Sequence, residues 1–321
     1  MEIKSLIMSQ SKPVKVIGIR RFDLNKLPAH GLAVNVGKRG TGKTSMEMYL
    51  SRHSPRAKTA IWIVMAGSEP VKQAWRKLVH PMFVMDPSIE YLEKLRAQQN
   101  KLAEKYPEDG EVPYPEELEI ELIIDDCGTL RWFMHSEILK WWAANGRHLH
   151  VNIRVMLQYI YMSPTDFREN IDSLRVQATG NLRNIQTLQR EYVTCTSLRE
   201  FTAILLQITS NRGTLFIDNG VNAQNVSDIC YKFRLTKQDL ADTTTLGSDK
   251  LRAWADKHSK ENMMRELQKQ RQEEGEEEDW VENDEEILRE MADVSWEDCE
   301  TTAYSDRFGR IIVRDLKQKN D

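Results

Sequence analysis

The stretch Gly37-Lys38-Arg39-Gly40-Thr41-Gly42-Lys43-Thr44 matches the phosphate-loop pattern G-x-x-x-x-G-K-[ST] without a mismatch. An apolar, largely β-branched run at 32–36 precedes it, and residues that favour a helix follow it at 45–50. That order of strand, loop and helix separates a phosphate loop from an ordinary glycine-rich turn. The sequence therefore predicts a loop that binds the phosphates of ATP.

The residue types in this loop fit that chemistry. Gly37 and Gly42 lack a Cβ, so the backbone can wrap closely around a phosphate chain. The helix N-terminus adds partial positive charge, Lys43 can reach the β- and γ-phosphates, and the Thr44 hydroxyl can ligate Mg²⁺. The residues expected to contact the nucleotide are Gly37, Lys38, Arg39, Gly40, Thr41, Gly42, Lys43, Thr44 and Ser45.

The charge of the chain is unevenly distributed along its 321 residues. Residues 1–235 carry a net charge of +6, whereas residues 236–321 carry −10, and the acids are densest at 273–290. We therefore expect an ATPase domain at 1–235 and an acidic C-terminal extension at 236–321, mostly helical or disordered. A mildly basic body suits contact with a polyanion, but phosphate-binding enzymes are often this basic.

Targeting and redox features are few. No run of 18 apolar residues exists, and the N-terminus lacks the apolar core of a signal peptide, so we expect a soluble protein without a membrane segment. The four cysteines are scattered, which favours reduced thiols in an intracellular protein.

Short apolar runs alternate with helical patterns over most of the body. Such alternation predicts an α/β fold with a mainly parallel sheet and helices on both faces. A helix is expected at 89–105 with Ser88 as its N-cap, and another at 132–144. Strands are expected at 14–19, 32–36, 59–65, 81–85, 119–126, 150–158, 174–178 and 214–218.

Two adjacent acids end the apolar run Leu122-Ile123-Ile124-Asp125-Asp126. Ligands of open parallel sheets bind at the carboxyl edge of the strands, where these acids are expected. Asp125 would hold Mg²⁺ and Asp126 would polarise the attacking water. Most P-loop ATPases of this layout place a glutamate second, so Asp126 is a departure, and a turn-forming acidic pair is the alternative.

Three further polar residues are candidates for the reaction. Gln158 ends the strand expected at 150–158, where its amide can hydrogen-bond the γ-phosphate or the water. Arg147 and Arg168 are candidates for the guanidinium that stabilises charge on the γ-phosphoryl group. The alternative for either arginine is a surface ion pair.

These motifs together resemble the DNA-packaging ATPases of nucleocytoplasmic large DNA viruses, in the FtsK–HerA superfamily of DNA pumps. The resemblance extends over about residues 14–235 and keeps the order of the motifs. It rests on Gly37–Thr44, Ile123–Cys127, Asn145–His148 leading into Gln158, and Arg168–Asn170, with support from Met65–Glu69 and Tyr91–Leu95.

The resemblance implies a RecA-like core with strand order 5-1-4-3-2. It also implies a homo-oligomeric ring, a pentamer or hexamer, that threads double-stranded DNA into a preformed capsid at its packaging vertex. Arg147 is the best match for the arginine that acts on the neighbouring subunit's ATP. The expected location is the host cytoplasm, in the viral factory, with the virion as a second place.

Three alternatives stay open from the sequence. A P-loop kinase shares the loop but as a rule lacks a second acid beside Asp125. A nucleotide-gated scaffold would hold ATP without hydrolysing it. Another DNA pump or helicase-like ATPase of the same superfamily would share the motifs, although such proteins commonly carry membrane segments or a DNA-reading domain, and the sequence contains no pattern for either.

Overall fold

The structure is a computed structural model and describes residues 18–27, 31–107, 109–221, 223–260, 301–305 and 311–315. The chain divides into two compact units, Met1–Ser248 and Asp249–Asp321. The phosphate loop and both acids of the paired-acid motif lie in the first.

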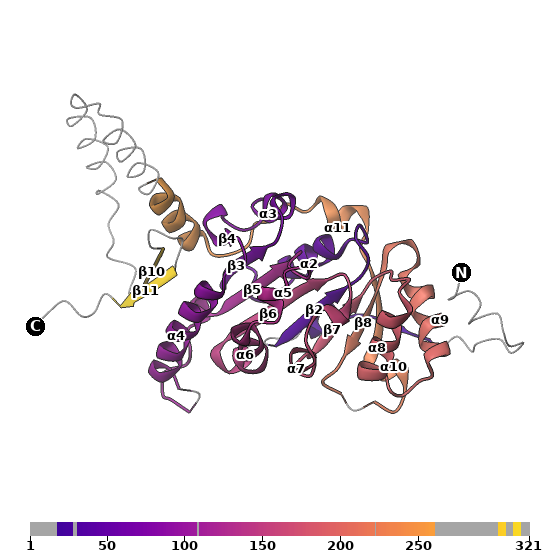
Figure 1. The fold of residues 1–321 in the computed structure, drawn as a ribbon. Coiled ribbons are helices and arrows are strands. Elements are labelled where there is room, and N and C mark those ends of the chain that lie inside the picture. Colours follow the sequence, from indigo (N-terminus) through magenta and orange to yellow (C-terminus); the bar gives the residue numbers. More distant parts are fainter. Residues whose placement is uncertain are drawn as a thin grey trace, which may run out of the picture. The chain divides into compact units, whose positions relative to one another are not determined.

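A nine-stranded sheet forms the first unit (Figure 1). Five of its strands are parallel neighbours in the order β7-β2-β6-β5-β3, which is 5-1-4-3-2 when these strands are numbered along the chain. The predicted strand order is therefore confirmed. Across the whole sheet the strands are β1 (Arg20–Arg21), β9 (Cys230–Arg234), β8 (Gly213–Asp218), β7 (Ser173–Val176), β2 (Leu32–Val36), β6 (Val151–Leu157), β5 (Ile120–Asp125), β3 (Ile61–Ala66) and β4 (Val84–Met85).

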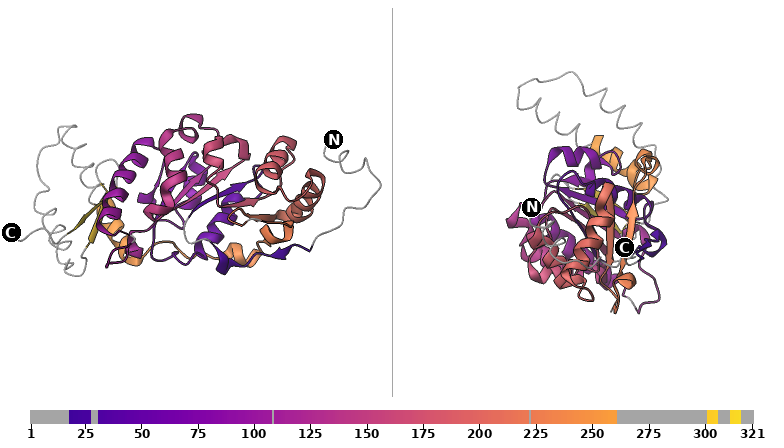
Figure 2. Two further views of the ribbon diagram at one scale, coloured as in Figure 1. Left: turned by 90° about the horizontal axis from the view of Figure 1, so that it is seen from below. Right: turned by 90° about the vertical axis from the view of Figure 1, so that its right-hand side faces the viewer.

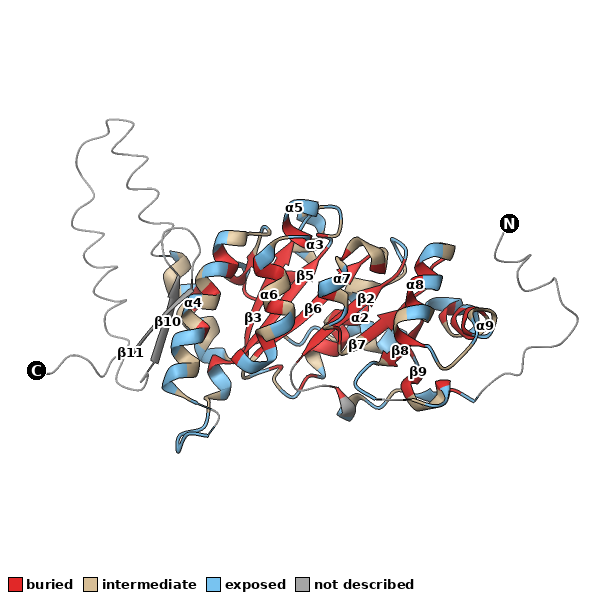
Figure 3. Cartoon of the chain, turned by 60° about the horizontal axis from the view of Figure 1, so that its bottom comes forward, coloured by how far each residue is buried: buried red, intermediate tan, exposed pale blue. Residues whose placement is uncertain are grey.

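The central strands are buried along their whole length, as the red ribbon in Figure 3 shows. A strand buried on both faces needs apolar residues in a continuous run rather than in alternation. Strands β2, β3, β5 and β6 satisfy this with runs rich in Val, Ile and Leu. Two polar pairs join β5 and β6: Glu121 accepts a hydrogen bond from Asn152, at 2.8 Å, and forms an ion pair with Arg154, at 2.9 Å.

Helices cover both faces of the sheet. Figure 2 shows α2 (indigo) and α11 (orange) on one face, and the helices from α4 through α9 (purple to coral) on the other. The helices of the first unit are α2 (Lys43–Arg52), α3 (Glu69–Trp75), α4 (Ile89–Lys105), α5 (Arg131–Met134), α6 (Glu137–Asn145), α7 (Thr165–Arg168), α8 (Leu182–Tyr192), α9 (Leu198–Thr209), α10 (Val226–Ile229) and α11 (Lys237–Ala241).

Strand β8 runs antiparallel to β7, with Val176 opposite Leu215. Its first residue, Gly213, therefore lies at the edge of the sheet where the parallel strands end. The short 3-10 turn η6 (Ser210–Arg212) leads into it from α9. This reversal brings a segment late in the chain to the same edge as the phosphate loop.

Several expected elements differ from the structure. The single helix expected at 132–144 is wrong: it is two helices, because Ser136 accepts a hydrogen bond from the Leu139 amide and starts α6 afresh. The strand expected at 14–19 falls largely outside the described residues, and Gly18 and Ile19 are not in a strand. Strand β9 was not predicted. By contrast, α4 and its Ser88 cap are confirmed.

The second unit is described only in part. Residues 249–260 are helical, and β10 (Thr301–Ser305) pairs antiparallel with β11 (Ile311–Asp315). The acidic segment 273–290 lies outside the described residues. Within the described ranges of both units, no helix has the length and apolarity needed to cross a membrane.

A buried carboxylate anchors the phosphate-loop helix to the sheet. Glu47, one turn after Lys43 in α2, is fully buried and accepts hydrogen bonds from Arg154 of β6, at 2.9 Å, and from Asn35 of β2. Arg175 of β7 lies 3.6 Å from the same carboxylate. Burial raises the pKa of Glu47, but the two guanidinium groups outweigh it and the net pKa is lowered. The group is therefore a charged tie between one helix and three strands.

We expect Glu47→Ala to destabilise the protein by about 3–5 kcal/mol, because it leaves two buried guanidinium groups without their shared carboxylate. Urea unfolding followed by circular dichroism measures this. Glu93→Ala, at an exposed position of the α4 helix, is the matched control and should shift the free energy of unfolding by less than about 0.5 kcal/mol. Equal stability of the two variants would show that the buried tie does not hold α2 in place.

Candidate nucleotide-hydrolysis site

The phosphate loop is held by the ends of two strands. The Gly37 amide donates to the Leu157 carbonyl at the end of β6, and the Lys38 amide donates to the Ala178 carbonyl just after β7. Gly40 and Gly42 have φ values of 77° and 98°, which favour glycine. The Lys43 ammonium donates to the carbonyls of Gly37 and Lys38, at 2.8 and 3.2 Å. The Lys43 ammonium thus lies inside the curve of the loop, which is the space that phosphate oxygens would occupy.

Asp125 ends β5 and faces the start of α2. Its Oδ2 accepts hydrogen bonds from the Thr44 hydroxyl at 2.8 Å and from Trp75 Nε1 at 3.1 Å. Burial raises the pKa of Asp125, and these two hydrogen bonds oppose the rise. Burial also lowers the pKa of Lys43, against the attraction of the two nearby acids. Asp125 and Lys43 are therefore both partly desolvated, and a bound ion would interact strongly with their charges.

Asp126 is exposed and turns away from the strand. It is one of four non-glycine residues at positive φ in the described part of the chain, at 57°. Ser68, just after β3, donates its hydroxyl to Asp126 Oδ2 at 2.7 Å. Gly67 packs so closely that a Cβ added there would lie 2.2 Å from the Asp126 carbonyl oxygen. This neighbouring loop therefore fixes the direction of the second acid.

A cleft of about 520 Å³ joins these residues at the carboxyl edge of the sheet. The structure places Lys43, Thr44, Asp125, Asp126 and Gln158 together on its walls. Other predicted loop residues that line it are Arg39, Gly40, Gly42 and Ser45. The remaining predicted loop residues, Gly37, Lys38 and Thr41, form the back of the loop; Thr41 contacts the Gln177 side chain at 3.3 Å.

The donor set fits Mg²⁺ with a nucleotide. Hydroxyl and carboxylate oxygens are the ligands that Mg²⁺ prefers, and this ion usually takes only one or two protein ligands beside waters and phosphates. Thr44 and Asp125 supply two such oxygens 2.8 Å apart. Within the described residues, no group of three acidic, histidine or cysteine ligands could hold a metal by itself.

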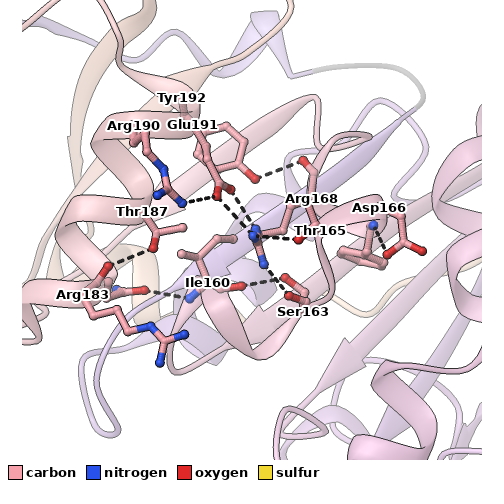
Figure 4. A network of polar contacts seen from close by, with 12 residues as sticks. Ile160, Ser163, Thr165, Asp166, Arg168, Arg183, Thr187, Arg190, Glu191 and Tyr192 are labelled. Atoms are coloured by element: carbon pink, nitrogen blue, oxygen red, sulfur yellow. Dashed lines mark hydrogen bonds and ion pairs between the residues drawn. The ribbon is translucent and has the colours of Figure 1, made fainter.

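The two arginine candidates lie apart from this cleft. Arg147 sits in the turn before β6, at the opposite edge of the sheet, where its side chain is 58% exposed and lies 3.9 Å from Asp172. Arg168 is held inside its own chain: its guanidinium donates to both carboxylate oxygens of Glu191 and to the Ser163 carbonyl (Figure 4). Neither reaches the phosphate loop of its own subunit.

Sequence reasoning missed three residues of the site. Trp75 and Ser68 contact the two acids, but a tryptophan in a helix and a serine after a strand carry no distinctive signal. Arg212 lines the cleft from the turn before β8. Only the antiparallel direction of β8 places it there, and the pattern of the chain did not reveal that direction.

The sheet order and the cleft at its edge define a class of protein, the P-loop ATPases. The chain belongs to the poxvirus A32 protein family, whose model matches residues 19–246. This membership confirms the resemblance to the DNA-packaging ATPases of large DNA viruses.

Three viral proteins are similar to the chain. Uncharacterized protein L437 of Acanthamoeba polyphaga mimivirus is 24% identical over 223 residues, 67% of this chain and 76% of that protein. Uncharacterized protein 015R of Frog virus 3 is 21% identical over 204 residues, 63% of this chain and 60% of that protein. A solved structure is also similar: the genome packaging NTPase B204 from Sulfolobus turreted icosahedral virus 2, in complex with ATP-gammaS. It is 14% identical to the chain, with a TM-score of 0.44, and the match covers 65% of this chain and 98% of that one. These similarities add no residue roles.

We expect Gly67→Ala to reduce ATP turnover on the order of 100-fold, because the added methyl group must displace the backbone of Asp126, and a shift of about 1 Å in a catalytic group has that effect. Gly180→Ala, where an added Cβ meets nothing within 4 Å, is the control and should retain wild-type turnover. Phosphate-release assays compare the two. Unimpaired turnover in Gly67→Ala would mean that the position of Asp126 does not matter.

Proposed function

We propose that the protein is an ATP-driven motor that moves double-stranded viral DNA into a preformed capsid. One observation supports this most: the loop lysine, the Mg²⁺-type oxygen pair, the second acid and Gln158 converge on one cleft of a 5-1-4-3-2 sheet. Family membership supplies the biological setting. Asp126, the second acid, lines the cleft, where it can take a proton from an attacking water.

The residues of the cleft account for hydrolysis. Thr44 and Asp125 would hold Mg²⁺, and the ion would supply positive charge to the phosphates of the nucleotide. Asp126 accepts a hydrogen bond from the water and takes its proton as the oxygen attacks the γ-phosphorus. The bond from that phosphorus to the bridging oxygen breaks, and ADP leaves with the electron pair. Gln158 orients the water or the γ-phosphate, and Lys43 stabilises the leaving oxygens.

The exposed position of Arg147 supports an active site completed by a neighbouring subunit. Its only ion pair in the described chain is long, at 3.9 Å, so the guanidinium is available to a partner. It lies at the sheet edge opposite the phosphate loop, and in a head-to-tail ring that edge can face the next subunit's ATP. Arg168, which is 12% exposed and doubly bound by Glu191, fits a supporting role better.

The remaining assignments follow from this proposal. The domain at 1–235 would carry out hydrolysis and bind duplex DNA without sequence preference, as its net charge of +6 suits. The extension at 236–321, with a net charge of −10, would not contact DNA directly. The ring would dock on the packaging vertex of the capsid, in the viral factory of the host cytoplasm.

The rival functions make different demands on the same cleft. A kinase needs an acceptor molecule and would release little phosphate without one. A non-hydrolysing scaffold would keep its biological activity in Lys43→Ala. Phosphate release that requires no acceptor and is lost with Lys43 therefore separates the proposed motor from both. Another DNA pump of the superfamily would pass this test as well. Only the proposed packaging motor would need a capsid in order to move DNA, and this requirement separates the two.

We expect Lys43→Ala to lose nucleotide binding or turnover, and Asp126→Asn to bind ATP while hydrolysing it about 100-fold more slowly or worse. Equilibrium binding and phosphate release give the two quantities separately. Asp109→Asn, the same change at an exposed loop position, serves as the control and should behave as wild type. Wild-type turnover in Asp126→Asn would remove that residue from the mechanism.

We expect Arg147→Ala to bind ATP nearly as well as wild type but to hydrolyse it roughly 10³-fold more slowly, the scale of an arginine finger. Mixing Lys43→Ala with Arg147→Ala subunits should restore part of the turnover, because some interfaces then combine an intact loop with an intact arginine. Mixed assemblies verified by mass that show no recovery would place the role of Arg147 within its own subunit. Arg168→Ala then becomes the next variant for the same mixing experiment.

A further inference from the structure

Arg212 is a cationic residue of the cleft that the mechanism above does not use. It lies in η6, just before β8, and lines the same cleft as Lys43, Asp125 and Gln158. Both acids come from the β5 side of the phosphate loop, whereas Arg212 comes from the β8 side. A phosphate held by the loop would therefore have the acids on one flank and this guanidinium on the other.

The guanidinium of Arg212 has no partner in the described part of the chain. It makes no hydrogen bond, ion pair or aromatic contact there, and the residue is exposed to the cleft. The other candidate arginines differ, because Arg147 lies at the opposite edge of the sheet and Arg168 pairs with Glu191. Arg212 is thus the one among these that combines a place in the cleft with an uncommitted charge.

The backbone around Arg212 is held in an uncommon conformation. Asn211 and Arg212 both have positive φ values, 51° and 61°, in the left-handed region that non-glycine residues uncommonly adopt. The neighbouring structure enforces them: Arg234 of β9 donates to the Ser210 carbonyl at 3.1 Å. A Cβ added at Gly213 would lie only 1.9 Å from the Ile208 carbonyl oxygen, so the chain must reverse tightly there. Residues held this way often sit at functional sites.

We propose that Arg212 binds the terminal phosphate of the nucleotide held by its own subunit and so distinguishes a nucleoside triphosphate from a diphosphate. The proposal rests on the function given above. A guanidinium suits the task because its planar fork matches two phosphate oxygens and its charge is permanent.

Two substitutions test this by equilibrium binding of ADP and of a non-hydrolysable β,γ-imido ATP analogue. Arg212→Ala should bind ADP as wild type does and the analogue about tenfold or more weakly, the effect of one charge-assisted hydrogen bond. Arg212→Gly should do the same, and it removes any concern about folding, because glycine is comfortable at a φ of 61°. Lys101→Ala, which removes an exposed positive charge from α4, should leave both affinities unchanged.

Each outcome has a definite meaning. An unchanged ratio of the two affinities in Arg212→Ala and Arg212→Gly, or equal weakening of both ligands, overturns the proposal. Recovery of analogue affinity on mixing Arg212→Ala with Lys43→Ala subunits would move the contact to the neighbouring subunit and also overturns it. If wild type binds nucleotide but shows no turnover, the proposed motor fails while this inference is still decided by the affinity ratio.

Discussion

The buried carboxylate of Glu47 is the contact on which the rest of the site depends. It ties the helix that begins at Lys43 to β2, β6 and β7 at once, through Asn35, Arg154 and Arg175. A phosphate loop works only if its amides and its lysine keep a fixed position relative to the acids of the next strands. A charged group buried in this way is costly to leave unpaired, so the arrangement tolerates little sliding of the helix. The geometry of the cleft therefore depends on buried contacts of Glu47 that do not line the cleft themselves.

Direction of the strands then decides which side chains meet. The five parallel strands end at one edge, which brings the loop after β2, the acids after β5 and Gln158 after β6 into one cleft. Arg147 precedes β6 and is therefore at the other edge of the sheet. The antiparallel β8 is the exception, since its start, not its end, lies at the catalytic edge. It adds Arg212 to a cleft otherwise built from strand ends.

The sequence predicted the phosphate loop, the paired acids and α4, because each depends on local residue types or on a motif of fixed spacing. The strand order followed only from the resemblance to a known family. Other features depend on tertiary structure and were missed. Ser136 starts a new helix inside a segment whose helical pattern looks continuous. Strand β9 is short and mixes Lys232 and Arg234 with apolar residues, so it carries no clear strand pattern. Trp75 and Arg212 enter the site only through the folding of distant segments. The roles of Arg147 and Arg168 stay predictions, because one chain does not reveal what a neighbour contributes.

The central claim is that hydrolysis in this cleft is coupled to duplex DNA. The most direct test measures phosphate release by the full chain with and without blunt duplexes of unrelated sequence, over a series of salt concentrations. DNA should raise the rate whatever its sequence, and the DNA concentration for half-maximal stimulation should rise steeply with salt, because the contacts are to phosphates. The same rate with and without DNA, or stimulation by one sequence only, would contradict it.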